Sequence, residues 1–222
     1  MTRSGWPPPA SAPRPRCPPS SRAARARTCS SSLRGRHSGF IACYAALANH
    51  DTDFVLIPEV PFALDGPGGF LAGLRRRVER RGHAVVVVAE GAGQELIARD
   101  GGRDDSGNVR LADIGGLLRD RITADFCAAG TRLALRYVDP GYAIRSVPAN
   151  AYDAVYCLRL AQAAVHAAMA GRTAMVVGRF VHLPISLAIG SRNQVDPDGD
   201  LRMSVLEATG QPSRFRSPGA AG

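Results

Sequence analysis

The segment RYVDPGYAIRS, residues 136–146, carries side chains that are well suited to hold a phosphate group. Tyr142 and Arg145 follow an Asp-Pro-Gly turn, and Arg136 stands six positions before Tyr142. A guanidinium group donates two parallel hydrogen bonds to phosphate oxygens, and a phenol hydroxyl adds a third donor. The spacing therefore predicts an anion-binding segment, with pairing of the two arginines to nearby surface acids as the alternative.

Three other polar groups stand at expected ends of strands or starts of helices. Glu90 leaves a run of valines for a glycine-rich loop, where its carboxylate can accept hydrogen bonds from sugar hydroxyls or simply be solvated. Gly35 and Arg36 belong to GRHSG at an expected helix start, where free backbone N–H groups attract anions, although an ordinary glycine cap is more common. Glu59 stands at an expected strand end between two prolines, where it could ligate a cation or accept a hydrogen bond from a hydroxyl, but it is interpreted as a structural turn residue.

The elements that must position these residues alternate along the chain. Apolar runs and helical periodicity predict strands at 53–59, 83–93, 131–139, 172–181 and 182–190, and helices at 37–50, 68–82, 111–130, 151–171 and 195–210. Alternating helices and strands favour parallel βαβ units, with helices on both faces of the sheet. In such folds the ligand lies at the carboxyl ends of the strands, where the three polar segments are expected to meet.

The distribution of charge argues against a nucleic-acid-binding body. The net charge is +9, but the first 50 residues contain eight of the 28 basic side chains and no acidic one. The remaining residues therefore balance 20 basic against 19 acidic side chains. All basic side chains are arginine, which excludes lysine chemistry such as Schiff bases or a phosphate-loop lysine.

Cysteine spacing and hydropathy exclude further classes of protein. The five cysteines show no CxxC spacing, which favours reduced thiols in the cytoplasm over a metal site or a disulfide framework. No apolar run approaches the roughly 20 residues needed to cross a bilayer. The sequence also lacks GxGxxG, Walker A and GxSxG motifs.

Composition divides the chain into three parts. Residues 1–34 are rich in Pro, Ser, Ala and Arg and are expected to be a disordered leader, since they can bury little apolar surface. A transit peptide is an alternative, but the favoured explanation is a shifted reading frame or a misassigned start in GC-rich DNA. Residues 35–212 form the expected α/β region, and residues 213–222 a flexible tail.

Six segments in order resemble the 6-phosphofructokinase family. They are GRHSGFIA, IPEVPF, VVVVAEGAGQ, YVDPGYAIRSVPANAYD, LAQAAVHAAMAGRT and ATGQP. The resemblance implies a three-layer α/β sandwich with a mostly parallel sheet. It also implies a cytoplasmic, glycolytic enzyme that transfers phosphate from ATP, or from pyrophosphate in some members, to the 1-hydroxyl of fructose 6-phosphate. Mg²⁺ as cofactor and a homodimer or homotetramer are implied as well.

The resemblance also assigns substrate-binding roles to individual residues. The family's Met-Gly-Arg segment falls on Arg34, Gly35 and Arg36, with arginine in place of the methionine, and its sugar-contacting glutamate falls on Glu90. The family's 6-phosphate contacts fall on the four residues Tyr142, Ala143, Ile144 and Arg145. Arg136 is expected to be a further contact, one that can serve the adjacent subunit.

The part of the family that binds the nucleotide is not found in this sequence. The Thr-Ile-Asp-Asn-Asp motif that carries the general base, the glycine-rich nucleotide loops and the Mg²⁺-binding acid have no counterpart, so no catalytic or metal-binding residue is assigned. We therefore expect a truncated, poorly active phosphofructokinase. A non-catalytic sugar-phosphate-binding or regulatory subunit is the alternative.

Overall fold

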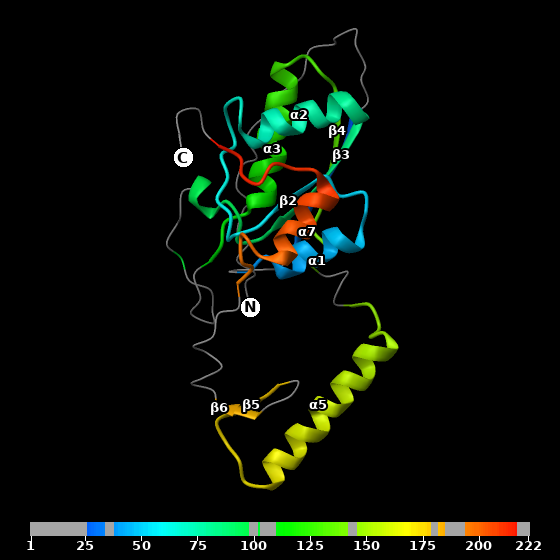
Figure 1. The fold of residues 1–222 in the computed structure, drawn as a ribbon, viewed down its shortest axis with the longest axis vertical. Coiled ribbons are helices and arrows are strands. Elements are labelled where there is room, and N and C mark those ends of the chain that lie inside the picture. The colour runs from blue at the N-terminus through cyan, green and yellow to red at the C-terminus, as the bar shows by residue number, and fades with distance from the viewer. Residues whose placement is uncertain are drawn as a thin grey trace, which may run out of the picture.

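A parallel four-stranded sheet in the order β2-β3-β1-β4 forms the centre of the fold (Figure 1). The computed structural model describes residues 26–33, 38–97, 102, 110–141, 146–178, 182–184 and 194–216. The strands of this sheet are β1 (Ala26–Leu33), β2 (Phe54–Leu56), β3 (His83–Ala89) and β4 (Leu133–Val138). All three strand pairs are parallel, as the alternating pattern predicts.

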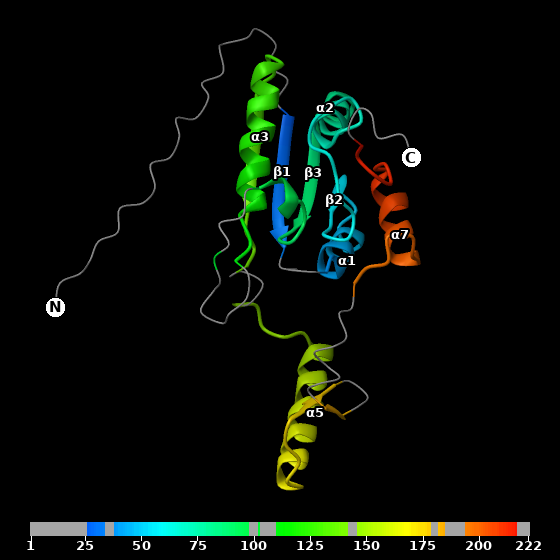
Figure 2. The same cartoon turned by 90° about the vertical axis from the view of Figure 1, so that its left-hand side faces the viewer.

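Helices cover both faces of this sheet. They are α1 (Phe40–Ala48), α2 (Phe70–Arg81), α3 (Ile114–Ala128) and α7 (Asp200–Thr209). The connections β1-α1-β2 and β2-α2-β3 run in opposite directions along the sheet, so right-handed crossovers place α1 and α2 on opposite faces. Helix α3 packs with β1, β4 and α2, while α7 packs with α1 and β2. The expected three-layer α/β architecture is therefore confirmed (Figure 2).

Local sequence signals explain where several elements begin and end. The run of valines forms β3, whose residues 86–89 are all buried, because a strand covered on both faces needs apolar side chains throughout. Helix α2 ends at Gly82, which has a φ of 76°, a left-handed conformation that glycine adopts without strain. Helix α3 begins after Asp113, whose carboxylate accepts a hydrogen bond from the Gly116 N–H group.

Strand β1 differs from the expected disorder of residues 1–34. Its eight residues, ARTCSSSL, lie between β3 and β4, so the expectation is wrong for 26–33. A serine-rich segment has low strand propensity, and the prediction rested on that composition. Backbone hydrogen bonds do not depend on side-chain type, however, and without a partner β3 and β4 would leave their inner backbone groups unpaired. The other leader residues lie outside the described part of the chain.

The ATGQP segment covers the free edge of β2. Gln211 is buried, and its amide accepts from Val55 N at 2.7 Å and donates to Val55 O at 3.2 Å. The side chain thus pairs with the strand as a further strand would. Such cover protects an edge from association with other chains.

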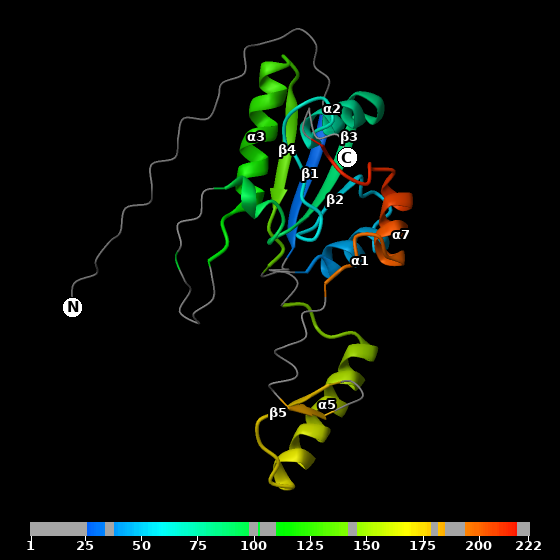
Figure 3. The ribbon, with the colours of Figure 1, turned by 60° about the vertical axis from the view of Figure 1, so that its left-hand side comes forward.

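A second unit contains α5 (Ala151–Met169), β5 (Met175–Val177) and β6 (His182–Pro184), which we call the lobe. Its two strands are antiparallel, with Val176 opposite Leu183. Helix α5 packs against β5, and the lobe stands apart from the four-stranded sheet in all three views (Figure 3). The two strands expected after residue 171 are therefore present, but they do not join the parallel sheet.

The prediction that the cysteines are reduced thiols holds for only some of them. Cys43 and Cys157 are free, but Cys127 is disulfide-bonded. Sequence spacing could not reveal this bond, because it depends on which cysteines the fold brings together. Burial raises the pKa of the Cys43 thiol to about 11; the positive charge of Arg202 opposes this shift, and the charge of Glu59 adds a smaller increase. Cys43 therefore stays protonated at neutral pH and is a poor nucleophile.

Candidate functional site

The carboxyl ends of the four parallel strands lie at the same end of the sheet (Figure 3). In the strand registers, Leu33 lies opposite Ala89, Leu56 opposite Val88, and Ser31 opposite Val138. Each predicted polar segment follows one of these ends. The fold thus directs all three segments to the edge where ligands bind in parallel α/β sheets.

The structure describes only two of the residues predicted to bind substrate. Glu90 and Arg136 are described; Gly35, Arg36, Tyr142, Ala143, Ile144 and Arg145 lie outside the described residues. The contacts of these six side chains therefore remain predictions. Of their chain neighbours, the end of β1 and the turn at Asp139 are described.

Glu90 lies at the start of a tight loop directly after β3 and is half-buried. Its backbone carbonyl accepts a hydrogen bond from Gln94 Nε2 at 2.8 Å. Ala92 N donates to Ala89 O at 2.9 Å, and Gly93 has a φ of 61°. These contacts hold the loop in one conformation, which limits the orientations available to the Glu90 carboxylate.

Gln94 is a positioning residue that the sequence analysis did not identify. Its side chain is buried and makes two further hydrogen bonds with Ala112, donating to the carbonyl at 3.0 Å and accepting from the N–H at 3.0 Å. The amide therefore joins the Glu90 loop to the residues before α3. The position of Gln94 at the end of AEGAGQ, beside Glu90, was the signal that could have identified it. Its partner Ala112 lies 18 residues later, and spacing along the chain does not reveal such a contact.

Replacing Gln94 by leucine is expected to lower the free energy of unfolding by about 2–3 kcal/mol, because part-buried backbone groups of Glu90 and Ala112 lose their partners. Equilibrium urea denaturation measures this change. Glu95→Leu is the matched control, since Glu95 is the exposed neighbour and its replacement should change stability by less than about 0.5 kcal/mol. Equal effects of the two substitutions would contradict the assigned role of Gln94.

Arg136 does not approach Glu90 within this chain. It lies opposite Cys29 of β1, which is also opposite Val85 of β3, so it is level with a residue five positions before Glu90. Five strand residues span about 16 Å. The Arg136 side chain is exposed on β4, which is an outermost strand of the sheet. The structure therefore separates two residues that the sequence analysis grouped around one substrate.

Glu59 links three segments at the same edge of the sheet. Its carboxylate accepts hydrogen bonds from Gly39 N at 2.9 and 3.1 Å and from Val195 N at 2.9 Å. A Cβ atom on Gly39 would lie 2.5 Å from Ile57 Cγ2, so the close approach requires glycine. Glu59 thus fixes the chain just after GRHSG, which confirms its interpretation as a structural residue.

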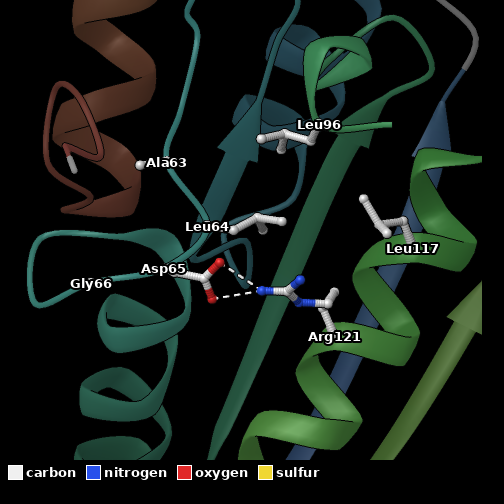
Figure 4. A pocket seen from close by; sticks show the side chains of 7 residues that line it. All are labelled: Ala63, Leu64, Asp65, Gly66, Leu96, Leu117 and Arg121. Atoms are coloured by element: carbon white, nitrogen blue, oxygen red, sulfur yellow. Dashed lines mark hydrogen bonds and ion pairs between the residues drawn. The ribbon is translucent and has the colours of Figure 1, made fainter. Parts of the chain in front are cut away.

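A cavity of about 390 Å³ lies near the Glu90 loop but contains none of the predicted site residues (Figure 4). Leu64, Leu96 and Leu117 supply its apolar wall, and an exposed ion pair joins Arg121 to Asp65 at 2.6 Å. Both charges are already paired with each other. The cavity therefore offers no free ionic group to a ligand.

The described residues do not fit a metal site. Within the described ranges, no three or more His, Cys, Asp or Glu side chains gather in a group that could hold a metal ion. We therefore derive no chemical step through a metal from this part of the chain. In addition, no helix in these ranges is long and apolar enough to span a membrane.

Comparison with known sequences gives a consistent match. The Phosphofructokinase family model matches residues 20–168. An ATP-dependent 6-phosphofructokinase from Amycolatopsis methanolica is 63% identical over 194 residues, which cover 82% of this chain and 42% of the relative. One from Borreliella burgdorferi is 48% identical over 196 residues, covering 83% and 44%. The chain thus spans less than half the length of these curated relatives.

Comparison with solved structures supports the fold. The crystal structure of a pyrophosphate-dependent phosphofructokinase from Marinobacter aquaeolei matches with a TM-score of 0.55 at 20% identity, covering 87% of this chain and 50% of that one. The family match begins within the leader, before the first segment that carried the resemblance, and therefore includes β1. Because the family model matches more than half of the chain, the protein belongs to the phosphofructokinase family.

Proposed function

We propose that this chain is the fructose 6-phosphate-binding part of an ATP-dependent 6-phosphofructokinase and transfers phosphate weakly or not at all by itself. The observation that carries the proposal is the position of Glu90. It follows the buried strand β3, at the ligand-binding edge, in a loop held by Gln94. In the proposed complex Glu90 accepts hydrogen bonds from sugar hydroxyls.

The 6-phosphate is assigned to the segment after β4. Tyr142 to Arg145 follow a turn in which Gly141 N donates to Asp139 Oδ1 at 2.9 Å, and Arg145 supplies the guanidinium group. Gly35 and Arg36 are assigned to the sugar from the end of β1. The distance along the sheet between Arg136 and Glu90 supports a role for Arg136 in the site of an adjacent subunit, within a homodimer or homotetramer.

The phosphoryl donor and its metal are assigned to the part of the family that this chain does not match. ATP is the proposed donor of the whole enzyme, since the curated relatives from Amycolatopsis methanolica and Borreliella burgdorferi are described as ATP-dependent. Mg²⁺ would stabilise the charge on the transferring phosphate when bound. The described residues offer no group of metal ligands, so this chain's own contribution is to bind and orient the sugar phosphate. The cytoplasm is the proposed compartment.

Isothermal titration calorimetry tests the assignment of the sugar site. The full chain is expected to bind fructose 6-phosphate and not fructose. Glu90→Ala and Arg145→Ala should each weaken binding by about tenfold to a hundredfold, because each removes charged hydrogen bonds. Glu207→Ala is a control for Glu90→Ala, since Glu207 is exposed on α7. Equal binding of fructose, or unchanged affinity in both site variants, would overturn the proposal.

A further inference from the structure

The cavity of about 390 Å³ near the Glu90 loop is large enough to hold a small molecule, and none of the predicted sugar-binding residues lines it. Sites for small molecules have volumes of about 300–1,000 Å³ and combine apolar walls with a few polar groups. Three separate parts of the chain form this cavity: the segment 63–66 before α2, the short helix that ends at Leu96, and the first half of α3. The chemistry of these three walls determines which molecule fits.

Backbone hydrogen bonds hold the walls of the cavity in place. Phe70 N donates to Ala63 O at 2.8 Å, which fastens the first wall to the start of α2. Leu96 N donates to Gly93 O at 3.0 Å, in the same loop that Gln94 joins to the residues before α3. The third wall is part of a continuous 15-residue helix. The cavity is therefore formed without a ligand, as most small-molecule sites are.

One side of the cavity is apolar. Leu64 is buried and Leu96 and Leu117 are half-buried, and each comes from a different wall. Figure 4 shows these three side chains on one side and the Arg121–Asp65 ion pair on the other. An apolar group that replaces water beside the three leucines is stabilised by the hydrophobic effect. This side therefore favours a ligand with an apolar body.

The ion pair on the other side selects against charged ligands. Arg121 Nη2 donates to Asp65 Oδ1 at 2.7 Å and to Oδ2 at 2.6 Å. These two residues carry the only charges among the seven described residues that line the cavity, so their charges cancel. A ligand anion beside Arg121 would also approach the Asp65 carboxylate, and a ligand cation would approach the guanidinium group.

The same ion pair has unused hydrogen-bond donors. A guanidinium group carries five N–H groups. Both bonds from Arg121 to Asp65 come from Nη2, and Arg121 makes no other hydrogen bond within the part of the chain that the structure describes. Nε and Nη1 can therefore donate to a ligand oxygen while the bonds to Asp65 stay in place. An uncharged acceptor such as a carbonyl oxygen suits this side of the cavity.

We propose that the cavity binds an uncharged small molecule with an apolar body and one hydrogen-bond acceptor, such as an aromatic ketone or amide. The apolar body contacts Leu64, Leu96 and Leu117, and the acceptor oxygen receives a hydrogen bond from Arg121. A protein partner does not suit a cavity lined by seven residues, because a stable interface buries about 800 Å² on each side. The proposal does not depend on sugar binding, because the two sites share no residue.

A fluorescence titration of the full 222-residue chain with prodan tests the proposal. Prodan is an uncharged naphthyl ketone whose emission moves to shorter wavelength in apolar surroundings. We expect saturable binding of one prodan per chain with a dissociation constant of about 10–200 µM, a usual affinity for a ligand of this size. Saturating fructose 6-phosphate should not displace it. Absence of saturable binding, or competition by fructose 6-phosphate, would overturn the proposal.

A substitution that fills the cavity distinguishes this site from adhesion to other apolar surface. Leu117→Trp should weaken prodan binding at least about tenfold, because the larger side chain occupies the space of the ligand. Met203→Trp is the matched control, since Met203 is 48% exposed on α7 and does not line the cavity. Val155→Asp, at an exposed position of α5, should also leave the affinity unchanged. Equal losses in Leu117→Trp and either control would contradict the assigned site.

A pair of ligands of equal size tests the selection against charge, and it does not depend on the folding of Leu117→Trp. Methyl naphthyl ketone and naphthoate have the same number of non-hydrogen atoms, and only naphthoate is charged. The ketone should displace prodan from the wild-type chain at a concentration at least about fivefold lower than naphthoate. In Asp65→Ala this preference should fall about fivefold, because the Arg121 charge is no longer balanced. Equal displacement in the wild type, or an unchanged preference in Asp65→Ala, would overturn the proposal.

Discussion

Replacing Asp53 by alanine is expected to lower the free energy of unfolding by about 3–5 kcal/mol. The Asp53 side chain is 1% exposed and accepts hydrogen bonds from Arg77 Nη1 at 2.8 Å, Arg81 Nη1 at 3.2 Å and Val85 N at 3.0 Å. Removing the carboxylate leaves the buried Arg77 guanidinium without its counter-charge and the Val85 N–H without a partner. An unpaired charge in the interior is far more costly than the loss of a surface ion pair.

Arg77 shows why the effect should spread beyond one ion pair. Its Nη2 donates to Thr209 O at 2.9 Å and to Gly210 O at 3.3 Å, and its guanidinium carbon lies 5.4 Å from the centre of the Phe54 ring. Asp53 and Arg77 thus join α2, the start of β2 and the end of α7. Loss of the carboxylate should weaken the packing of these three elements against one another.

Urea denaturation followed by circular dichroism measures the expected loss for Asp53→Ala. Asp65→Ala is the matched control, since Asp65 forms an exposed ion pair with Arg121 and its removal should cost less than about 1 kcal/mol. The free energy of unfolding of a domain is about 5–15 kcal/mol. The Asp53 variant should therefore either show a denaturation midpoint at a lower urea concentration or be unfolded without urea. Similar midpoints for both variants would show that the buried network contributes little.

Phe70→Ala is expected to have a destabilising effect of similar size, about 3–5 kcal/mol. Phe70 is fully buried at the start of α2, and its ring centre lies 5.6 Å from that of Phe54, 6.2 Å from that of Phe62 and 5.6 Å from that of Phe215. Edge-on contacts between such rings stabilise a core beyond the area they bury. Alanine would leave a cavity between three aromatic side chains.

The same substitution should loosen the C-terminal segment. Phe215 packs on Phe70, and its backbone carbonyl accepts from Ala63 N at 3.1 Å. Thermal denaturation should show a lower melting temperature, and amide hydrogen exchange should be faster at Ala63. Tyr44→Ala is the control, because Tyr44 is 62% exposed and its loss leaves no cavity. Unchanged exchange at Ala63 would refute the proposed link between Phe70 and the terminal segment.

Local signals were sufficient to predict most of the body from the sequence. The valine run, the glycine after α2 and the alanine-rich pattern of α5 each appear in the structure as expected. These predictions succeeded because periodicity and glycine conformations are properties of nearby residues. Parallel pairing followed from the alternation of elements, so the edge at which Glu90 lies could also be predicted.

Features set by distant contacts could not be predicted in this way. Strand β1 forms in a serine-rich segment because two other strands flank it. The hydrogen bonds of Gln94 to Ala112 join residues 18 positions apart, and those of Gln211 to Val55 join residues 156 positions apart. The separation of Arg136 from Glu90 follows from register, which spacing along the chain does not reveal.

Phosphorus NMR of the full chain with fructose 6-phosphate, ATP and Mg²⁺ tests the central claim most directly, because one sample reports both binding and transfer. The account predicts that the sugar-phosphate resonance broadens in a concentration-dependent way, and that fructose 1,6-bisphosphate forms far more slowly than in the usual range for kinases, or not at all. Formation of fructose 1,6-bisphosphate at about 1–100 turnovers per second, the usual range for kinases, would contradict the account. So would an unchanged sugar-phosphate resonance at saturating protein.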